Sequence, residues 1–223
     1  MKPFNKYFDH TLLKPDASAD EISKVAREAL EYDFCSVCVA GCRVPYVKRL
    51  LEGSNIKTAC VTGFPLGSAT VSAKAFETEE AIKNGADEID TVINIGLVKE
   101  GRFDDLGDEI KIISDICHKS EVVLKTIIET CLLTEEEIAK VCRIAESAGT
   151  DYIKTSTGFS TGGARPEDIM LMRASAPSVS IKASGGIRTL DDAVAMINAG
   201  ADRLGCSSSV SIMNEYFMKN SRI

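Results

Sequence analysis

Short apolar runs alternate along the chain with longer stretches in which apolar residues recur at helical spacing. Eight of the apolar runs have the length and composition of buried strands. They cover residues 8–11, 36–39, 57–61, 88–93, 122–127, 152–155, 179–182 and 203–206. The periodic stretches between them predict amphipathic helices, two of which begin with a capping box, at Ser18 with Glu21 and at Thr134 with Glu137. The pattern therefore predicts an α/β protein in which strands and helices alternate throughout.

Three predicted helices end in the same way, with glycine, a small residue, aspartate and then a strand. The three joints are Gly85-Ala86-Asp87, Gly149-Thr150-Asp151 and Gly200-Ala201-Asp202. A glycine just past a helix can take the left-handed conformation that ends it. A repeated joint and eight strands in 223 residues favour one (β/α)8 TIM barrel that forms a single domain over residues 1–223. A doubly wound sheet is the alternative.

Composition narrows the possible partners and the compartment. The chain is 44% hydrophobic and 26% charged, as is usual for a globular protein. Its net charge of -7 argues against a nucleic acid or an anionic membrane as partner. No apolar run approaches the ~20 residues of a spanning helix. Because the N-terminus lacks the apolar core of a signal peptide, we expect a cytoplasmic location.

Eight cysteines are present, and two of them, Cys35 and Cys38, form a C-x-x-C motif. Such a motif can be a redox pair or half of a zinc site. No second motif or nearby histidine completes a metal cage, and the pair lies within the strand-like run FCSVCV. We therefore favour reduced, buried thiols that pack like small apolar residues.

The candidate chemistry centres on Lys154, at the end of the sixth predicted strand in DYIKTSTGF. In a barrel, catalytic groups lie at the carboxyl ends of strands. Lys182 ends the next strand on the corresponding face, and neighbouring strands lie about 4.8 Å apart. The two ammonium groups can therefore come close together.

The effect of one ammonium group on the pKa of the other can be calculated approximately. A free lysine has a pKa of ~10.4, and a nucleophile at neutral pH needs a pKa about three units lower, or about 4 kcal/mol. A second positive charge ~5 Å away supplies about 3 kcal/mol at an effective dielectric of ~20, and desolvation supplies the rest. One amine can then attack a carbonyl and form a Schiff base. Alternatively, each lysine pairs with a carboxylate or binds an anion, and the spacing does not decide between these interpretations.

A carboxylate is available for proton transfer. In DEIDTVIN, Glu88 and Asp90 share one strand face, and an acidic side chain inside a barrel is costly unless it is paired. Asp90 can move protons directly or through water, or it can be a counter-ion for a lysine. Both interpretations make Asp90 a neighbour of Lys182.

Two loops fit a phosphate group. Ser184-Gly185-Gly186-Ile187-Arg188 follows the seventh strand, and Gly205-Cys206-Ser207-Ser208 follows the eighth. Glycine amides and helix N-termini bind anions, and barrels often hold phosphate after these two strands. The alternatives are plain tight turns and, for Arg188, a surface cation.

Six segments together resemble the deoxyribose-phosphate aldolase family, in the same order and across nearly the whole chain. They are FDHTLLKPDA, TGFPLGSATVSAKAFETEEAIKNGADEIDTVINIG, LKTIIETCLLTEEEI, YIKTSTGF, KASGGIRT and RLGCSSS. The resemblance implies a (β/α)8 barrel and a class I aldolase that needs no metal or organic cofactor. It implies reversible cleavage of 2-deoxy-D-ribose 5-phosphate into D-glyceraldehyde 3-phosphate and acetaldehyde, in deoxyribose catabolism. Family members are often dimers, so a homodimer is expected.

The resemblance also implies roles for particular residues. Lys154 would form the Schiff base, Lys182 would be the cation that lowers its pKa, and Asp90 would transfer protons. Positions that match the family's substrate and phosphate contacts are Gly158, Gly185, Gly186, Ser207 and Ser208, with Asp9 and Thr11 beside the site. His10 gains no catalytic role from the match, and we expect it to serve packing.

Two departures from the family pattern stand out. Ala40-Gly41 replaces an Asn-Pro pair that many members carry, and the chain lacks the terminal tyrosine that assists proton transfer in some members. We expect Tyr216 to pack rather than to replace that tyrosine. Two other functions stay open from the residues: a different enzyme on the same scaffold, and a non-catalytic phosphosugar-binding protein.

Overall fold

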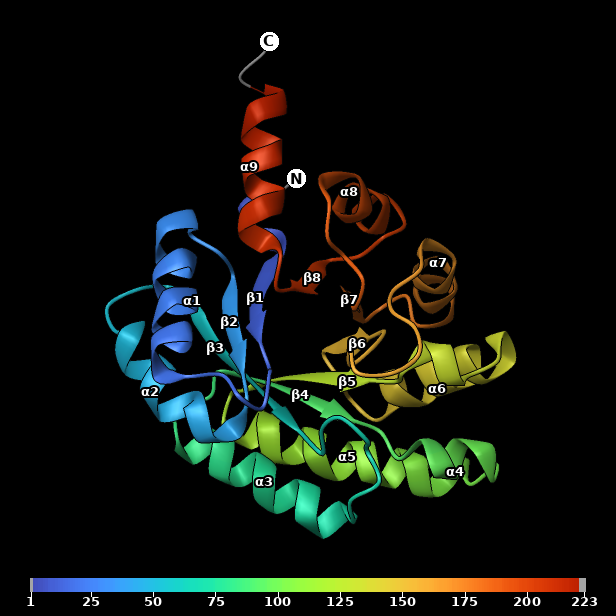
Figure 1. The fold of residues 1–223 in the computed structure, drawn as a ribbon. Helices are drawn as coiled ribbons and strands as arrows, with labels where there is room; N and C mark the ends of the chain where they lie inside the picture. Colours follow the sequence, from blue (N-terminus) through green and yellow to red (C-terminus); the bar gives the residue numbers. More distant parts are fainter. Residues whose placement is uncertain (1, 221–223) are drawn as a thin grey trace.

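The computed structural model describes residues 2–220, and its centre is a closed barrel of parallel strands in the order β1 to β8 (Figure 1). The strands are β1 (Phe8–Leu12), β2 (Ser36–Val39), β3 (Lys57–Thr62), β4 (Glu88–Val92), β5 (Val123–Ile127), β6 (Tyr152–Lys154), β7 (Ser180–Ser184) and β8 (Arg203–Cys206). Closure confirms the predicted (β/α)8 barrel, and the doubly wound alternative was wrong. No predicted strand end differs from the observed end by more than two residues.

Helices surround the barrel and connect successive strands (Figure 1). They are α1 (Ala19–Tyr32), α2 (Val44–Leu50), α3 (Val71–Lys83), α4 (Ile95–Lys99), α5 (Phe103–Lys119), α6 (Glu135–Ser147), α7 (Pro166–Ser175), α8 (Leu190–Asn198) and α9 (Ser209–Asn220), with short 3-10 turns η1 (Phe4–Tyr7), η2 (Gly41–Arg43) and η3 (Thr130–Leu132). Both predicted capping boxes form. In the described residues, no helix is long and apolar enough to cross a membrane.

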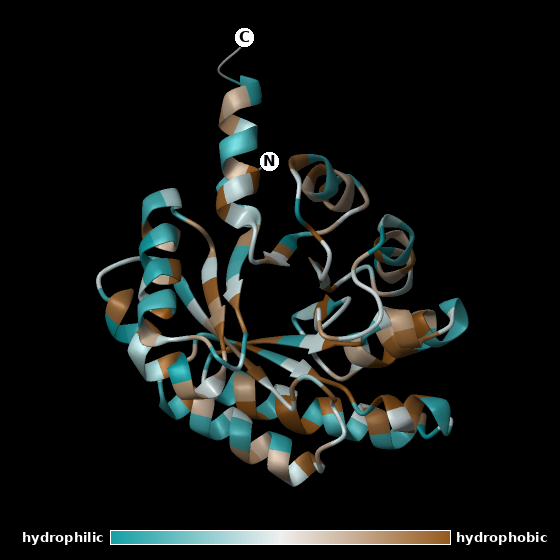
Figure 2. Ribbon diagram, viewed as in Figure 1, coloured by the Kyte–Doolittle hydropathy of each residue, from teal (hydrophilic) through white to brown (hydrophobic). Residues whose placement is uncertain are grey.

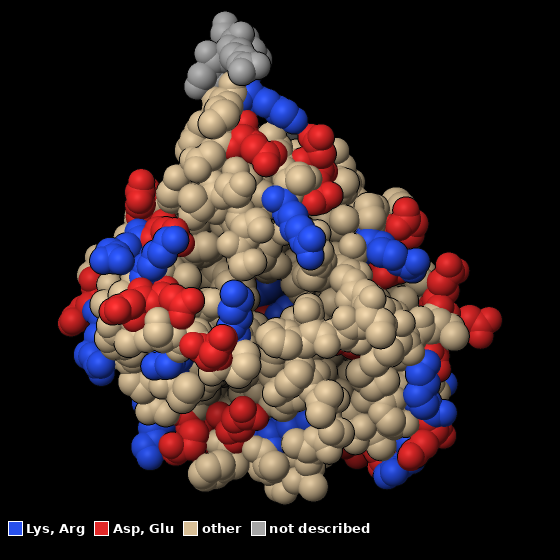
Figure 3. Space-filling model, viewed as in Figure 1, with Lys and Arg blue, Asp and Glu red and all other residues tan. Residues whose placement is uncertain are grey.

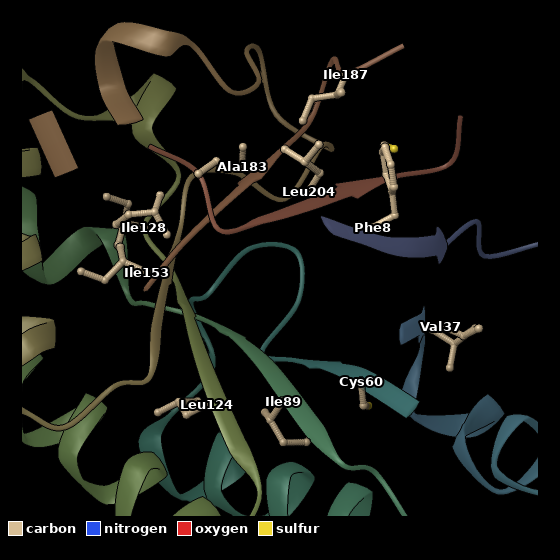
Figure 4. Packing of buried hydrophobic residues seen from close by; sticks show 14 of the residues in the cluster. Phe8, Val37, Cys60, Ile89, Leu124, Ile128, Ile153, Ala183, Ile187 and Leu204 are labelled. Atoms are coloured by element: carbon tan, nitrogen blue, oxygen red, sulfur yellow. The ribbon is translucent and has the colours of Figure 1, made fainter. Parts of the chain in front are cut away.

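Alternation along each strand separates an apolar outer face from a mixed interior. Buried side chains on the outer face pack against the helices, among them Phe8, Val37, Ile89, Leu124 and Ile153 (Figure 4). The helices carry apolar residues interspersed with hydrophilic ones, as expected for one-sided packing (Figure 2). All eight cysteines are free, and Cys38 is buried as expected, whereas Cys35 is only half-buried.

The barrel interior is divided into two unlike halves. Cys38, Ala59 and Val61 form a small apolar cluster on the β2–β3 side. The corresponding inward positions on β4 to β8 carry charged side chains, such as Asp90 and Lys182. Charge is therefore concentrated on one side of the interior, and the site is built there.

The three repeated joints share one structure at the amino end of the barrel. Gly85, Gly149 and Gly200 have φ angles of 101°, 90° and 110°, in the left-handed region. The aspartate of each joint accepts a hydrogen bond from a backbone N–H of the preceding strand: Asp87 from Thr58 (2.9 Å), Asp151 from Leu124 (2.7 Å) and Asp202 from Ile181 (2.8 Å). The repeat thus fastens strands together far from the strand ends that carry the site.

Both departures from the family pattern lie in regular surroundings. Ala40 precedes the 3-10 turn η2, which begins at Gly41 and leads directly into α2. Tyr216 on α9 stacks on Phe4 with 4.5 Å between ring centroids. The expectation that Tyr216 serves packing is therefore confirmed.

Candidate active site

The two candidate lysines face the barrel interior side by side. Lys154 on β6 is in register with Lys182 on β7. Both ammonium groups donate to the same oxygen, Oδ2 of Asp90, over 2.8 and 2.7 Å. The predicted proximity of the three groups is confirmed, and they share a single acceptor atom.

Asp90 lies at the centre of this group and is fully buried. Its second oxygen, Oδ1, accepts a hydrogen bond of 2.8 Å from Lys125 on β5. Burial alone would raise the pKa of Asp90, but the charges of Lys125, Lys154 and Lys182 outweigh it and hold the pKa well below its ordinary value. Asp90 therefore stays ionised.

Two further carboxylates extend the network toward the amino end. Asp9 on β1 pairs with Lys182 over 2.5 Å and accepts hydrogen bonds from Arg203 and Ser36. Glu88 on β4 pairs with Lys125 over 2.6 Å and with Arg203 over 2.8 Å. Within residues 2–220 this interior network joins four cations to three carboxylates. One cation is therefore in excess when every group is ionised.

The pKa shifts single out Lys154 as that cation. Burial lowers the pKa of Lys154, the charge of Lys182 lowers it further, and the opposing effect of Asp90 does not restore it. Burial acts in the same direction on Lys125 and Lys182, but their carboxylate partners raise both pKa values above the ordinary value. Lys154 therefore loses its proton most easily.

Burial, rather than Lys182, is the larger cause of the lowered pKa of Lys154. From sequence we gave Lys182 the larger share. Asp90, which touches both lysines, raises the pKa of Lys154 by more than Lys182 lowers it, so the net lowering comes from burial.

A cavity of about 270 Å³ opens at the carboxyl ends of the strands. Lys154 reaches it from the barrel interior, whereas Asp90, Lys125 and Lys182 lie outside its lining. The other lining residues with a predicted role are Thr11, Gly158, Gly185, Gly186, Arg188, Ser207 and Ser208, and Lys14 joins them. Figure 3 shows Lys or Arg side-chain atoms inside a hollow near the middle of the visible face.

The glycine loops come close to one another at one end of this cavity. Gly158, Gly185 and Gly186 have φ angles of 84°, 83° and 81°, which favour glycine. In the described part of the chain, their N–H groups donate to no other residue. A Cβ on Gly163 would lie 2.3 Å from the carbonyl oxygen of Gly185, so only glycine allows this approach. The result is a narrow cup with unpaired amides, which suits an anion.

The two residues from β1 occupy different depths. Thr11 lines the cavity, and its Oγ1 donates to the carbonyl oxygen of Asp9. Asp9 is fully buried and lies outside the lining, where it pairs with Lys182 and Arg203. His10 faces away from the site and contacts Glu28 on α1 over 2.9 Å, so its expected role in packing is confirmed.

Sequence reasoning missed three contributors. Lys125 lies in the middle of the apolar run VVLKTII, and Arg203 begins β8; an interrupted apolar run was the only signal for the lysine. Gly205 was noted only as a loop residue. A Cβ there would lie 2.9 Å from Cε of Lys182, so this glycine makes room for the lysine.

The fold and the site define an enzyme class, and comparisons with known proteins identify it. Residues 4–213 match the model of the DeoC/LacD family aldolases. The chain therefore belongs to that aldolase family and is a carbon–carbon lyase. Within the family it groups with the deoxyribose-phosphate aldolases. It is 54% identical over 210 residues to the deoxyribose-phosphate aldolase of Streptococcus gordonii, a match that covers 94% of each chain.

Solved structures agree with this grouping. An aldolase described as QR15 has a TM-score of 0.94 and 39% identity and covers 100% of both chains. The deoxyribose phosphate aldolase of Aeropyrum pernix, described as a unique tetramer, has a TM-score of 0.90 and 31% identity over 96% of this chain and 90% of its own.

Proposed function

We propose that this enzyme reversibly cleaves 2-deoxy-D-ribose 5-phosphate into D-glyceraldehyde 3-phosphate and acetaldehyde through a Schiff base on Lys154, in deoxyribose catabolism. One observation carries the proposal: among residues 2–220, Lys154 is the cation of the buried network that opens onto a cavity, and glycine loops whose amides have no partner in that range line the same cavity. Two relatives that are 52% and 54% identical to this chain carry the name deoxyribose-phosphate aldolase, which supports 2-deoxy-D-ribose 5-phosphate as the substrate.

The reaction begins with the neutral amine of Lys154, whose lowered pKa makes this form accessible. The nitrogen adds to the substrate carbonyl, water leaves, and a protonated imine forms. The imine accepts the electron pair of the breaking carbon–carbon bond, which leaves an enamine on Lys154 and releases the aldehyde product. Protonation of the enamine and hydrolysis of the imine then return the free amine and release acetaldehyde.

Proton movement runs through the shared oxygen of Asp90. Because Lys125, Lys154 and Lys182 hold the pKa of Asp90 low, Asp90 is ionised at rest, so it would accept a proton from Lys154 or its adduct only transiently and then return it. Lys182, whose pKa is raised, supplies a positive charge beside the imine and keeps its proton between steps. Dehydration, cleavage and reprotonation each need such a transfer.

The phosphate end of the substrate would occupy the cup of Gly158, Gly185 and Gly186, with Ser207 and Ser208 beside it. The side chains of Lys14 and Arg188, which also line the cavity, add positive charge. Binding energy gained at the phosphate would orient the carbonyl toward Lys154.

Reductive trapping tests the proposal. Acetaldehyde and sodium borohydride should convert Lys154 to its N-ethyl form, which peptide mass spectrometry locates. Lys154→Arg keeps the charge but should abolish both the label and the cleavage of 2-deoxy-D-ribose 5-phosphate. A label on any other residue, or full turnover by the Lys154→Arg protein, would sink the assignment.

The same proposal includes a single catalytic domain over residues 1–223, a cytoplasmic location and a homodimer. The Aeropyrum pernix tetramer makes the dimer a specific point to test by light scattering.

A further inference from the structure

Glu129 is an unusual residue in the loop between β5 and the 3-10 turn η3. Its φ angle is 53°, in the left-handed region, where a side chain is unfavourable. In the described residues, two other non-glycine residues, Asp33 and Glu121, share this conformation, and both are exposed. Glu129 is only 2% exposed. A buried, strained carboxylate indicates a constraint that the surrounding structure enforces.

The carboxylate of Glu129 binds a single residue of the next loop. It accepts the backbone N–H of Thr157 at 3.2 and 3.3 Å from its two oxygens, and the hydroxyl of Thr157 at 2.5 Å. Glu129 makes no ion pair with any residue between 2 and 220. Its charge is therefore held by the two donors of Thr157 together with a weak contact of 3.9 Å from the thiol of Cys131.

Thr157 connects Glu129 to the backbone on the far side of Gly158. Since the hydroxyl of Thr157 donates to Glu129, its oxygen is free to accept, and it accepts the N–H of Phe159 at 3.1 Å. The backbone is thereby fixed on both sides of Gly158, the first glycine of the cup. Across the cup, a Cβ on Gly158 would lie 3.9 Å from Cα of Gly185. The position of Gly158 relative to Gly185 thus depends on Glu129.

We propose that Glu129 is a positioning residue for the phosphate end of the substrate, acting through Thr157 on the cup. The inference rests on the proposed function for the identity of that substrate. A carboxylate is required because it only accepts hydrogen bonds, so it leaves the Thr157 hydroxyl oxygen for Phe159. In a glutamine, the amide nitrogen would replace one of the carboxylate oxygens, so its N–H groups would face the N–H of Thr157 and could not accept its hydrogen bond.

A comparison of two substrates tests this role. For Glu129→Gln we expect KM for 2-deoxy-D-ribose 5-phosphate to rise about tenfold or more, as for the loss of a hydrogen bond to a charged group, with a smaller change in kcat. The kcat/KM for unphosphorylated 2-deoxy-D-ribose should stay within about twofold, because the lysine chemistry is untouched. Glu121→Gln, an exposed glutamate in the same backbone conformation, is the matched control and should change neither value.

Variants of Thr157 keep the test decisive if Glu129→Gln folds poorly. Thr157→Val should reproduce the selective rise in KM, and Thr157→Ser, which keeps the hydroxyl, should restore it. Equal losses on both substrates, or no change on either, would overturn the proposal. Acetaldehyde trapping at Lys154 is measured in every variant, because its absence from the unmodified enzyme would refute the proposed function and not the role of Glu129.

Discussion

Two buried lysines in different regions of the molecule invite comparison. Lys74 on α3 lies outside the barrel and is fully buried, and Lys154 inside the barrel is 3% exposed. Burial is the largest cause of a lowered pKa in both. A lowered pKa by itself therefore does not distinguish a reactive lysine from a structural one.

The two lysines differ in their partners and in their access. Lys74 has its own carboxylate, Glu109 at 2.9 Å, and also donates to the carbonyl oxygen of Val92 at 2.7 Å. It is covered by Gly63, where a Cβ would lie 3.0 Å from its Cε. Lys154 shares Asp90 with two other lysines and opens onto the cavity. Reactivity requires an excess of cations and an opening, in addition to burial.

Replacing each of these two lysines with methionine should give the largest effects, on stability at Lys74 and on labelling at Lys154. Lys74→Met leaves Glu109 buried without its counter-ion, with only the backbone N–H of Asn94 among the described residues still donating to it, and should cost about 3–5 kcal/mol of unfolding free energy, with labelling of Lys154 retained in the folded protein. Lys154→Met should abolish the label at a much smaller cost in stability, because it removes the excess cation. Urea unfolding and borohydride labelling measure the two outcomes. The double variant Lys74→Met/Glu109→Leu is the control and should recover most of the stability.

Removal of the neighbouring charge should shift the pH dependence of Lys154. Lys182→Met takes away a cation that lowers the pKa of Lys154 and leaves Asp90, which raises it. Since only the neutral amine reacts, labelling rises with pH through the pKa, and the profile should move to higher pH. The rate of borohydride labelling across pH is the measurement. An unchanged profile would refute the coupling between the two lysines.

Much of this site could be predicted from sequence because its signals are local. The strand bounds followed from apolar runs, and the alternation along YIK and SIKAS correctly placed Lys154 and Lys182 on inward faces. Asp90 followed from the cost of an unpaired carboxylate inside a barrel. Each inference needed only one strand and the spacing of its neighbours.

The balance of charges could not be predicted in this way. Lys125 and Asp90 are 35 positions apart, and Arg203 and Glu88 are 115 positions apart. Which groups meet depends on the stagger of strands around the closed barrel, which no single run encodes. The burial of Lys154 depends on the same closure of the barrel. That burial is the largest cause of its lowered pKa could therefore not be predicted from sequence either.

A methyl group at Gly205 should disturb the network without removing a charge. The new Cβ of Gly205→Ala would lie 2.9 Å from Cε of Lys182, so the end of this lysine must shift, and we expect its hydrogen bond to Asp90 to weaken. We expect about 1–3 kcal/mol of destabilisation and a shift of the labelling profile in the same direction as for Lys182→Met, but smaller. Thermal unfolding and labelling across pH measure both. Gly107→Ala, where the Cβ meets only an ordinary contact of 3.6 Å, is the control; equal effects at the two glycines would contradict this account.

The smallest expected effect belongs to a cation outside the buried network. Lys14 lines the cavity but is exposed, so water screens its charge. Lys14→Gln should raise KM for 2-deoxy-D-ribose 5-phosphate by about fivefold, near 1 kcal/mol, and more at low ionic strength, since salt weakens an exposed charge pair. KM for unphosphorylated 2-deoxy-D-ribose and the labelling profile of Lys154 should not change. Lys24→Gln, an exposed lysine outside the cavity lining, is the matched control. A shift in the labelling profile of the Lys14 variant would mean that an exposed charge also sets the pKa of Lys154, and would contradict the assignment of that pKa to burial and the interior charge network.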